Sequence, residues 1–259
     1  MIPFFRRNGR LMLAGIAVSL FCFALSALFT AQSAVPTGSW GLSFRTEGQP
    51  PIGNATAAAL RNYDAVYVGD TEEKVIYLTF DAGYEAGYTE QILDVLKKHD
   101  VKAAFFVVGT YIENNPELVR RMIDEGHVVG NHSWKHPNYS GLSVEEAEQD
   151  LMKLHNYVKE NFDYTMRYFR FPSGNFSERA LAEAQQLGYK SIFWSFAYRD
   201  WLTDDQPNEA EALKKIVDSA CPGMIYLLHA VSKTNADILA DVIDGVTAKG
   251  FTWGDPAKI

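Results

Sequence analysis

Short apolar runs alternate with longer segments of helical spacing along most of the chain. The runs are typical of β-strands and predict strands at residues 75–80, 103–108, 127–130, 168–171, 190–194 and 224–228. One helix is predicted to begin at Thr89, and a second to span 116–125 with Pro116 as its first residue. A third is predicted to begin after Ser143, which with Glu146 fits a capping box. Three more are predicted at roughly 178–187, 209–219 and 236–249.

This alternation predicts an α/β fold, because a helix between two strands brings those strands into parallel pairing. Six or seven such units predict a (β/α) barrel, an incomplete or distorted (β/α)7, as a single catalytic domain over residues 73–259. An open doubly wound sheet remains the alternative, since periodicity does not separate the two. In both architectures the active site lies at the carboxyl ends of the strands.

The first 34 residues differ from the rest. Arginines at positions 6, 7 and 10 precede an apolar run from Leu11 to about Phe29, and small residues follow at Ala31 and Ser33. This order is typical of a secretory signal peptide, and cleavage is the favoured interpretation. An uncleaved membrane anchor is the alternative, because the run approaches the ~20 residues that span a bilayer. Either way the remainder is predicted to be extracytoplasmic.

Residues 35–72 are loop-like and contain several Gly and Pro, so they predict an N-terminal extension that packs on the domain. Trp40, Phe44 and Tyr63 are the side chains that would pin it there. Apart from Cys22 in the leader, Cys221 is the one cysteine, which excludes an internal disulfide in the domain. A structural thiol is favoured there over a nucleophile.

The net charge limits the classes of partner that the chain is expected to bind. The leader holds three of the 24 Lys and Arg and none of the 32 Asp and Glu, so the remainder has 21 basic residues and a net charge of −11. No basic surface for nucleic acid is expected on such a chain. Contact with a membrane is expected only through the N-terminal segment if it is uncleaved, and we expect a monomer.

Chemically capable residues follow the predicted strands. Asp81, His132 and His229 each come at or just after a strand end, Arg170 lies in the fourth strand, and Asp200 and Trp201 follow the fifth by a short loop. Because these ends meet at one face of the fold, we expect the residues to form one site.

Each residue type has a chemical and a structural interpretation. His132 and His136 are four apart, so on a helix they would share a face and bind one metal ion, although most such pairs only cap or cover a surface. Asp81 can act as a general base or cap the next turn. Arg170 can lower the pKa of Asp81 or form a structural ion pair. His229 can donate a proton near neutral pH or be a satisfied core histidine.

The order of the motifs resolves these alternatives. Thr79-Phe-Asp-x-Gly83, His132-Ser-x-x-His136, Arg170-x-Pro-x-Gly174, Asp200-Trp201 and Leu227-x-His229 resemble, in that order, the polysaccharide deacetylase family, also called carbohydrate esterase family 4 or the NodB homology domain. The resemblance covers about residues 73–255. The segments 77–87, 130–137 and 225–232 are most similar to its spore-cortex branch, which removes acetyl groups from N-acetylmuramic acid in peptidoglycan and leads to muramic δ-lactam.

The resemblance implies a role for each residue. Asp81 would be the base that activates water, with Arg170 to orient it, and His229 would be the acid, oriented by Asp200. His132 and His136 would bind a divalent cation, zinc or similar. Substrate would contact the residues that line the sugar pocket or shape its loops, namely Tyr84, Trp201, Leu227, Pro172 and Gly174.

Position 82 departs from the family pattern. Most members carry a second Asp there as a metal ligand, whereas this chain has Ala82, as the spore-cortex branch does. The implied cofactor site is therefore one carboxylate short, which leaves the metal's identity and requirement open.

Three functions follow as hypotheses. The first is a hydrolase, an N-deacetylase of N-acetylmuramic acid in peptidoglycan glycan strands that serves δ-lactam formation in the spore cortex. The second is deacetylation of N-acetylglucosamine in peptidoglycan or chitin oligomers. The third is a glycan-binding pseudoenzyme that has lost its metal, against which the presence of both a base and an acid argues.

Overall fold

Parallel strands form the centre of the computed structural model, which describes residues 35–43 and 46–259. The predicted leader at 1–34 lies outside the described residues. The main sheet runs in the order β11 (Ile225–His229), β5 (Val75–Ala82), β6 (Ala103–Val107), β7 (Val128–Asn131), β8 (Tyr168–Phe169), β10 (Lys190–Ile192) and β4 (Ala65–Val66). A short β12 (Thr252–Trp253) also pairs with β5. All of these pairings are parallel.

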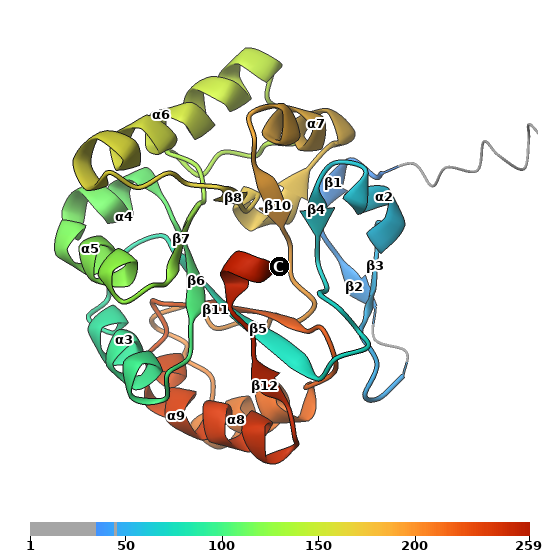
Figure 1. Ribbon diagram of the computed structural model, residues 1–259, viewed down its shortest axis with the longest axis vertical. Coiled ribbons are helices and arrows are strands. Elements are labelled where there is room, and N and C mark those ends of the chain that lie inside the picture. Colours follow the sequence, from blue (N-terminus) through green and yellow to red (C-terminus); the bar gives the residue numbers. More distant parts are fainter. Residues whose placement is uncertain (1–34, 44–45) are drawn as a thin grey trace, which may run out of the picture. The chain divides into compact units, whose positions relative to one another are not determined.

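Helices cover the outside of this sheet, which curls into an incomplete barrel (Figure 1). They are α3 (Thr89–Lys98), α4 (Gly109–Asn114), α5 (Pro116–Asp124), α6 (Val144–Phe162), α7 (Glu178–Gln186), α8 (Glu209–Asp218) and α9 (Lys233–Ala248). The predicted (β/α) barrel is thereby confirmed. The capping box of Ser143 and Glu146 is present at the start of α6. Helix α9 begins at Lys233 rather than 236, because the Ser232 hydroxyl accepts the Asn235 N–H and caps it earlier.

The segment expected to be loop-like contains short regular elements instead. They are β1 (Gly38–Ser39), β2 (Leu42–Ser43), β3 (Ile52–Gly53), α2 (Ala57–Arg61) and β4. Strands of two residues and a helix of five are too short to produce a periodic pattern, which is why the sequence did not indicate them. Since β4 pairs with β10, this segment also supplies the outermost strand on that side of the sheet.

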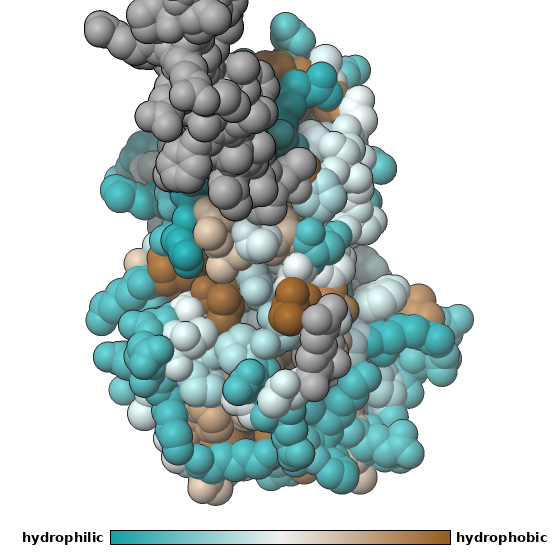
Figure 2. All heavy atoms as spheres, turned by 90° about the vertical axis from the view of Figure 1, so that its right-hand side faces the viewer, coloured by the Kyte–Doolittle hydropathy of each residue, from teal (hydrophilic) through white to brown (hydrophobic). Residues whose placement is uncertain are grey.

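The core explains why the strands read as continuous apolar runs. Every residue of β6 is buried, because helices cover one side of the sheet and the barrel interior the other. A smaller cluster that includes Phe106, Ile192 and Ile225 packs apart from the main core. Figure 2 shows a largely hydrophilic outer face on which hydrophobic residues form small separate patches. Among the described helices, none is long and apolar enough to cross a membrane.

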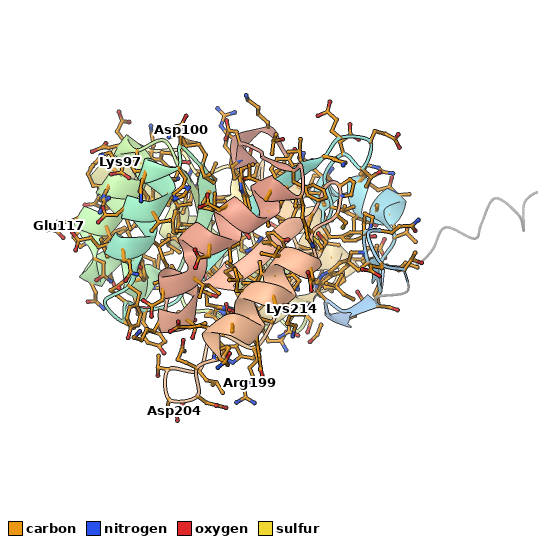
Figure 3. All side chains as sticks on the ribbon, turned by 90° about the horizontal axis from the view of Figure 1, so that it is seen from below. Lys97, Asp100, Glu117, Arg199, Asp204 and Lys214 are labelled. Carbon is orange, nitrogen blue, oxygen red and sulfur yellow. The ribbon has the colours of Figure 1, made fainter. Side chains whose placement is uncertain are left out.

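The carboxyl ends of the strands open at one end of the molecule. Figure 3 shows Arg199 and Asp204, in the loop between β10 and α8, at the end opposite to Lys97 and Asp100, which lie where α3 leads back to β6. Asp200 and Trp201 belong to the same loop as Arg199. The predicted chemistry therefore gathers at the carboxyl end.

Candidate active site

Asp81 and His229 are neighbours because of strand register. In the parallel pairing of β11 with β5, His229 stands opposite Asp81. Asp81 is 7% exposed, and the His229 side chain is about a quarter exposed, so both are largely buried but still reach solvent. The sheet thus places a carboxylate and an imidazole side by side without any contribution from flexible loops.

A buried guanidinium holds the Asp81 carboxylate. Arg170 is fully buried, and its Nη1 donates to Asp81 Oδ1 at 2.8 Å. Its Nη2 donates to Thr79 Oγ1 at 2.8 Å and its Nε to the Ile192 carbonyl at 3.0 Å, which fixes the orientation of the guanidinium. Burial works against the charged form of Asp81, but the nearby His132 and Arg170 outweigh it and lower its pKa. Asp81 is therefore ionised at neutral pH.

His132 lies between these two residues. Its Nδ1 is 2.8 Å from the Arg170 carbonyl oxygen, which can only accept, so Nδ1 carries the proton. Nε2 is 3.4 Å from Asp81 Oδ2 and is left with its lone pair. Burial lowers the pKa of His132 to about 4, so this imidazole is neutral at neutral pH.

His136 approaches His132 through a loop rather than a helix. The ring centroids are 4.9 Å apart, and the backbone reaches this arrangement with positive φ at Ser133 (74°) and His136 (56°). Ser133 Oγ accepts the His136 N–H at 2.8 Å and Asn131 Oδ1 accepts the Ser133 N–H at 2.8 Å, so the turn is held by side chains. The helical face imagined from the spacing is absent from this segment, although the two rings still meet.

These imidazoles fit a divalent cation in part. His132 Nε2 has the tautomer that a metal ligand needs, and burial also lowers the pKa of His136. Ala82, where a second carboxylate would stand, is fully buried. Within residues 35–43 and 46–259, no three His, Cys, Asp or Glu side chains form a metal-binding group. The donor set therefore fits a cation held by two nitrogens, with the other ligands from solvent or substrate.

Asp200 orients His229 from the loop after β10. Its Oδ1 is 2.7 Å from His229 Nδ1, and its Oδ2 accepts the backbone N–H of the same residue at 2.9 Å. Burial disfavours the imidazolium, but the hydrogen bond and charge of Asp200 outweigh it and raise the pKa of His229. The site thus pairs an ionised carboxylate with a histidine that tends to stay protonated.

A cavity of about 590 Å³ opens above these groups. It is lined by Asp81, Gly83, Tyr84, His132, His136, Ser173, Trp194, Ala197, Trp201, Leu227, His229 and Val231. Tyr84 and Trp201 are about half exposed, and the Trp201 ring lies 5.5 Å from the His229 ring. Exposed aromatic rings beside a polar centre are suited to stacking on sugar rings.

Two predicted substrate contacts lie away from this lining. Pro172 and Gly174 are buried in the short turn η1 (Pro172–Gly174), and Ser173 between them faces the cavity with φ of 51°. A side chain at Gly174 would come within 2.7 Å of Trp194, so the close packing of this turn against Trp194 requires glycine there. The sequence interpretation missed Ser173, Trp194, Ala197 and Val231. Motif proximity was the available signal for Ser173 and for Val231, two residues after His229, whereas nothing marked Trp194 and Ala197.

Comparisons with known proteins agree with this geometry. The sequence profile of the family described as polysaccharide deacetylase matches residues 68–192. The peptidoglycan-N-acetylmuramic acid deacetylase PdaA of Bacillus subtilis is 42% identical to this chain over 217 residues, 83% of this chain and 82% of PdaA.

Solved structures resemble the chain as well. The structure of Bacillus subtilis PdaA, described as a family 4 carbohydrate esterase, superimposes with a TM-score of 0.79 and covers 83% of this chain and 93% of that one. A family 4 carbohydrate esterase from Bacillus anthracis is 43% identical, with a TM-score of 0.66 over 75% of this chain and 86% of its own.

Proposed function

The chain belongs to the polysaccharide deacetylase family, and from that membership we propose that it hydrolyses the N-acetyl amide of N-acetylmuramic acid residues in peptidoglycan. The observation that carries the proposal is its 42% identity to Bacillus subtilis PdaA, which extends over 83% of the chain. The paired ionised Asp81 and protonated His229 supply what amide hydrolysis requires, a base and an acid.

In this proposal Asp81 accepts a proton from water as the water oxygen attacks the acetyl carbonyl carbon. Arg170 holds the carboxylate in place and keeps it ionised. When the C–N bond breaks, His229 gives its Nε2 proton to the sugar nitrogen, and acetate and a free amine result. Asp200 holds His229 by Nδ1, which leaves Nε2 for this transfer.

His132 and His136 are the residues that we propose to hold a divalent cation, zinc or similar. Such a cation would polarise the acetyl carbonyl and lower the pKa of bound water. Both imidazoles are neutral near pH 7 because burial lowers the pKa of each, so their lone pairs are available. Because Ala82 supplies no carboxylate, we expect this site to bind a cation more weakly than a site with three protein ligands would.

The cavity supports a sugar as the bound group. Its volume of about 590 Å³ suits a saccharide unit, with Tyr84 and Trp201 as stacking surfaces and Leu227 in the wall. Peptidoglycan lies outside the cytoplasm, which agrees with the signal peptide or membrane anchor predicted at residues 1–34. The free amine of the product is the group that would close onto the lactyl carboxyl, so we also propose a role before δ-lactam formation in the spore cortex.

Acetate release tests this function. The chain without its first 34 residues is incubated with peptide-free glycan strands that contain both acetylated sugars, and mass spectrometry of the digested product identifies the sugar that lost its acetyl group. We expect loss from muramic acid, and loss confined to glucosamine would contradict the proposal. Asp81→Asn should lower kcat by about 10²- to 10⁴-fold. Asp163→Asn is the matched control, since Asp163 is exposed and in the left-handed conformation that Asn tolerates.

Chelation tests the cation separately. Treatment with EDTA followed by dialysis should lower activity, and Zn²⁺ should restore it. A His132→Ala/His136→Ala double variant should bind no Zn²⁺ by calorimetry. Full activity after chelation, with no Zn²⁺ bound to the wild type, would remove the cation from the proposal and leave the deacetylase itself standing.

A further inference from the structure

Behind His229 and Asp200 lies a third polar side chain with no place in the family motifs. Asn235, the third residue of α9, is 1% exposed, and its backbone N–H is already capped by Ser232. Its side-chain Nδ2 donates to Asp200 Oδ2 at 2.6 Å and to the His229 carbonyl at 3.2 Å. Both donor hydrogens of the amide are therefore directed at the acid pair.

The orientation of this amide follows from its partners. The Asp200 carboxylate accepts only, so the NH₂ group must face it and Oδ1 must face away. Oδ1 meets the Tyr198 hydroxyl, which therefore donates. Tyr198 is 8% exposed, so the hydrogen-bonded series Tyr198–Asn235–Asp200–His229 runs through the interior, with the Asp200 carboxylate accepting from Asn235 on one side and from His229 on the other.

Asp200 depends on these donors because it is fully buried. Its Oδ1 faces His229 Nδ1, and its Oδ2 accepts the His229 N–H and the Asn235 amide. In the described part of the chain no Lys or Arg forms an ion pair with Asp200. Apart from the charge of His229, this buried carboxylate is stabilised by the hydrogen bonds made to it, so each donor affects how firmly the ion is held.

We infer that Asn235 is a positioning residue for the proton donor: it fixes the Asp200 carboxylate so that Oδ1 holds His229 Nδ1 and leaves Nε2 facing the substrate. The inference rests on the proposed function for its kinetic consequences and on the hydrogen bonds alone for its geometry. Without the Asn235 amide, Asp200 Oδ2 keeps one backbone donor and the carboxylate can rotate away from the imidazole.

The charge on His229 should respond to this support. His229 is faced by Asp200 from the loop before α8, by Asp81 on β5, by Arg170 after β8 and by His136 after β7. Asp200 is its hydrogen-bond partner among them, so loosening Asp200 weakens the stabilisation of the imidazolium. The pKa of His229 should then fall, while contacts to the sugar stay as they are.

The test compares Asn235→Ala with the wild type in two ways. We expect kcat to fall by about 10- to 100-fold with KM within about twofold, as when the partner that orients a functional histidine is lost. We also expect the His229 pKa, from NMR titration of its imidazole, to fall by about one unit. Asn161→Ala is the matched control, because the exposed Asn161 amide bonds only to the Tyr157 carbonyl.

Asn235→Asp separates positioning from simple packing. Two adjacent carboxylates share a proton as the pH falls, and a protonated Asp can again donate to Asp200. We expect activity to be lost at alkaline pH and partly regained at mildly acidic pH. Tyr198→Phe removes the far donor and should lower kcat by only a few-fold.

Two results would overturn the inference. One is an Asn235→Ala variant with wild-type kcat and a wild-type His229 titration. The other is a loss of kcat equal at every pH with the titration unchanged, since that is the signature of a structural role. If Asn235→Ala does not fold, the absence of acid recovery in Asn235→Asp is decisive against it. Failure of the proposed function shows differently, as a wild type that releases no acetate but whose His229 titration still responds to Asn235.

Discussion

Arg170 donates hydrogen bonds from all three of its guanidinium nitrogens, to Asp81, Thr79 and backbone carbonyls. Replacing it with Met leaves Asp81 buried without its cation, and removing one partner of a buried pair costs about 3–5 kcal/mol. Arg170→Met should lower the free energy of unfolding by that amount in urea denaturation and abolish acetate release. Arg120→Met is the control, because Arg120 donates its hydrogen bonds to backbone carbonyls and otherwise lies over the Phe162 ring, with no buried carboxylate to leave unpaired, so its replacement should cost about 1 kcal/mol. Equal unfolding curves for the two variants would contradict the prediction.

The Asp200 carboxylate sets where activity declines on the alkaline side. Because Asp200 raises the pKa of His229, the proton donor keeps its charge to a higher pH than a free imidazole would, and activity should fall as the pH rises through that raised value. Asp200→Asn removes the negative charge, so the alkaline limb of kcat should move to lower pH and kcat should drop. A pH profile of both proteins measures this. An alkaline limb that does not move would assign proton donation to another group.

At the scale of elements, the N-terminal strap formed by β1 and Trp40 supports the wall of the cavity. β1 pairs with β9 (Asn175–Phe176), and the Trp40 N–H donates to the Gly174 carbonyl at 2.8 Å. Its indole Nε1 donates to the Trp194 carbonyl at 2.9 Å, and its ring lies 4.9 Å from that of Phe193. The strap therefore holds the turn that carries Ser173 and the strand end that carries Trp194.

Trp40→Ala tests this support. Truncating a buried Trp costs about 3–5 kcal/mol, which should appear as a lower thermal midpoint. Because Ser173 and Trp194 line the cavity while the base and acid lie on β5 and β11, KM should rise more than kcat falls. Trp40→Phe keeps most of the packing and loses the Nε1 hydrogen bond. Its thermal midpoint and KM should therefore lie between those of the wild type and of Trp40→Ala. A Trp40→Ala protein that is destabilised but has wild-type KM would show that the strap acts on stability alone.

The elements that sequence predicted correctly share a physical reason. Strands such as β5 and β6 are buried on both faces, and helices such as α6 carry a cap and a full apolar stripe, so each leaves a long pattern. β1 and β4 are two residues long and leave none. Their positions depend on partners in β9 and β10, more than a hundred residues away, which no local pattern encodes.

The site shows the same division. Parallel register made the adjacency of Asp81 and His229 predictable, since both end neighbouring strands. The meeting of His132 with His136 was expected from helical spacing but arises from a turn with two left-handed residues. Asn235 and Trp194 escaped notice because their roles depend on side-chain contacts across the fold, with Asp200 and with Trp40.

At the scale of the whole molecule, stability against acid depends on histidines that are buried in neutral form. His127, 4% exposed, precedes β7 and so lies at the end of the barrel away from the site. Its Nδ1 accepts the Ala103 N–H at 3.2 Å, and its Nε2 has no partner among the described residues. Burial lowers its pKa to about 4, and His132 has a similar value.

The sign of the effect follows from proton uptake. Between pH 6.5 and about 4 the unfolded chain binds a proton at His127 that the folded chain does not, so stability falls as the pH falls through this window. A shift of that size corresponds to about 3 kcal/mol at its limit. His127→Asn removes the proton site, while the Asn oxygen can still accept the Ala103 N–H. Urea denaturation should show that the free energy of unfolding falls less between pH 7 and pH 4.5 in this variant than in the wild type. Acetate release at pH 7 should be unchanged. The remaining loss is expected to include His132 and His136, whose pKa values burial also lowers. Equal losses in variant and wild type would mean that His127 is not buried in neutral form.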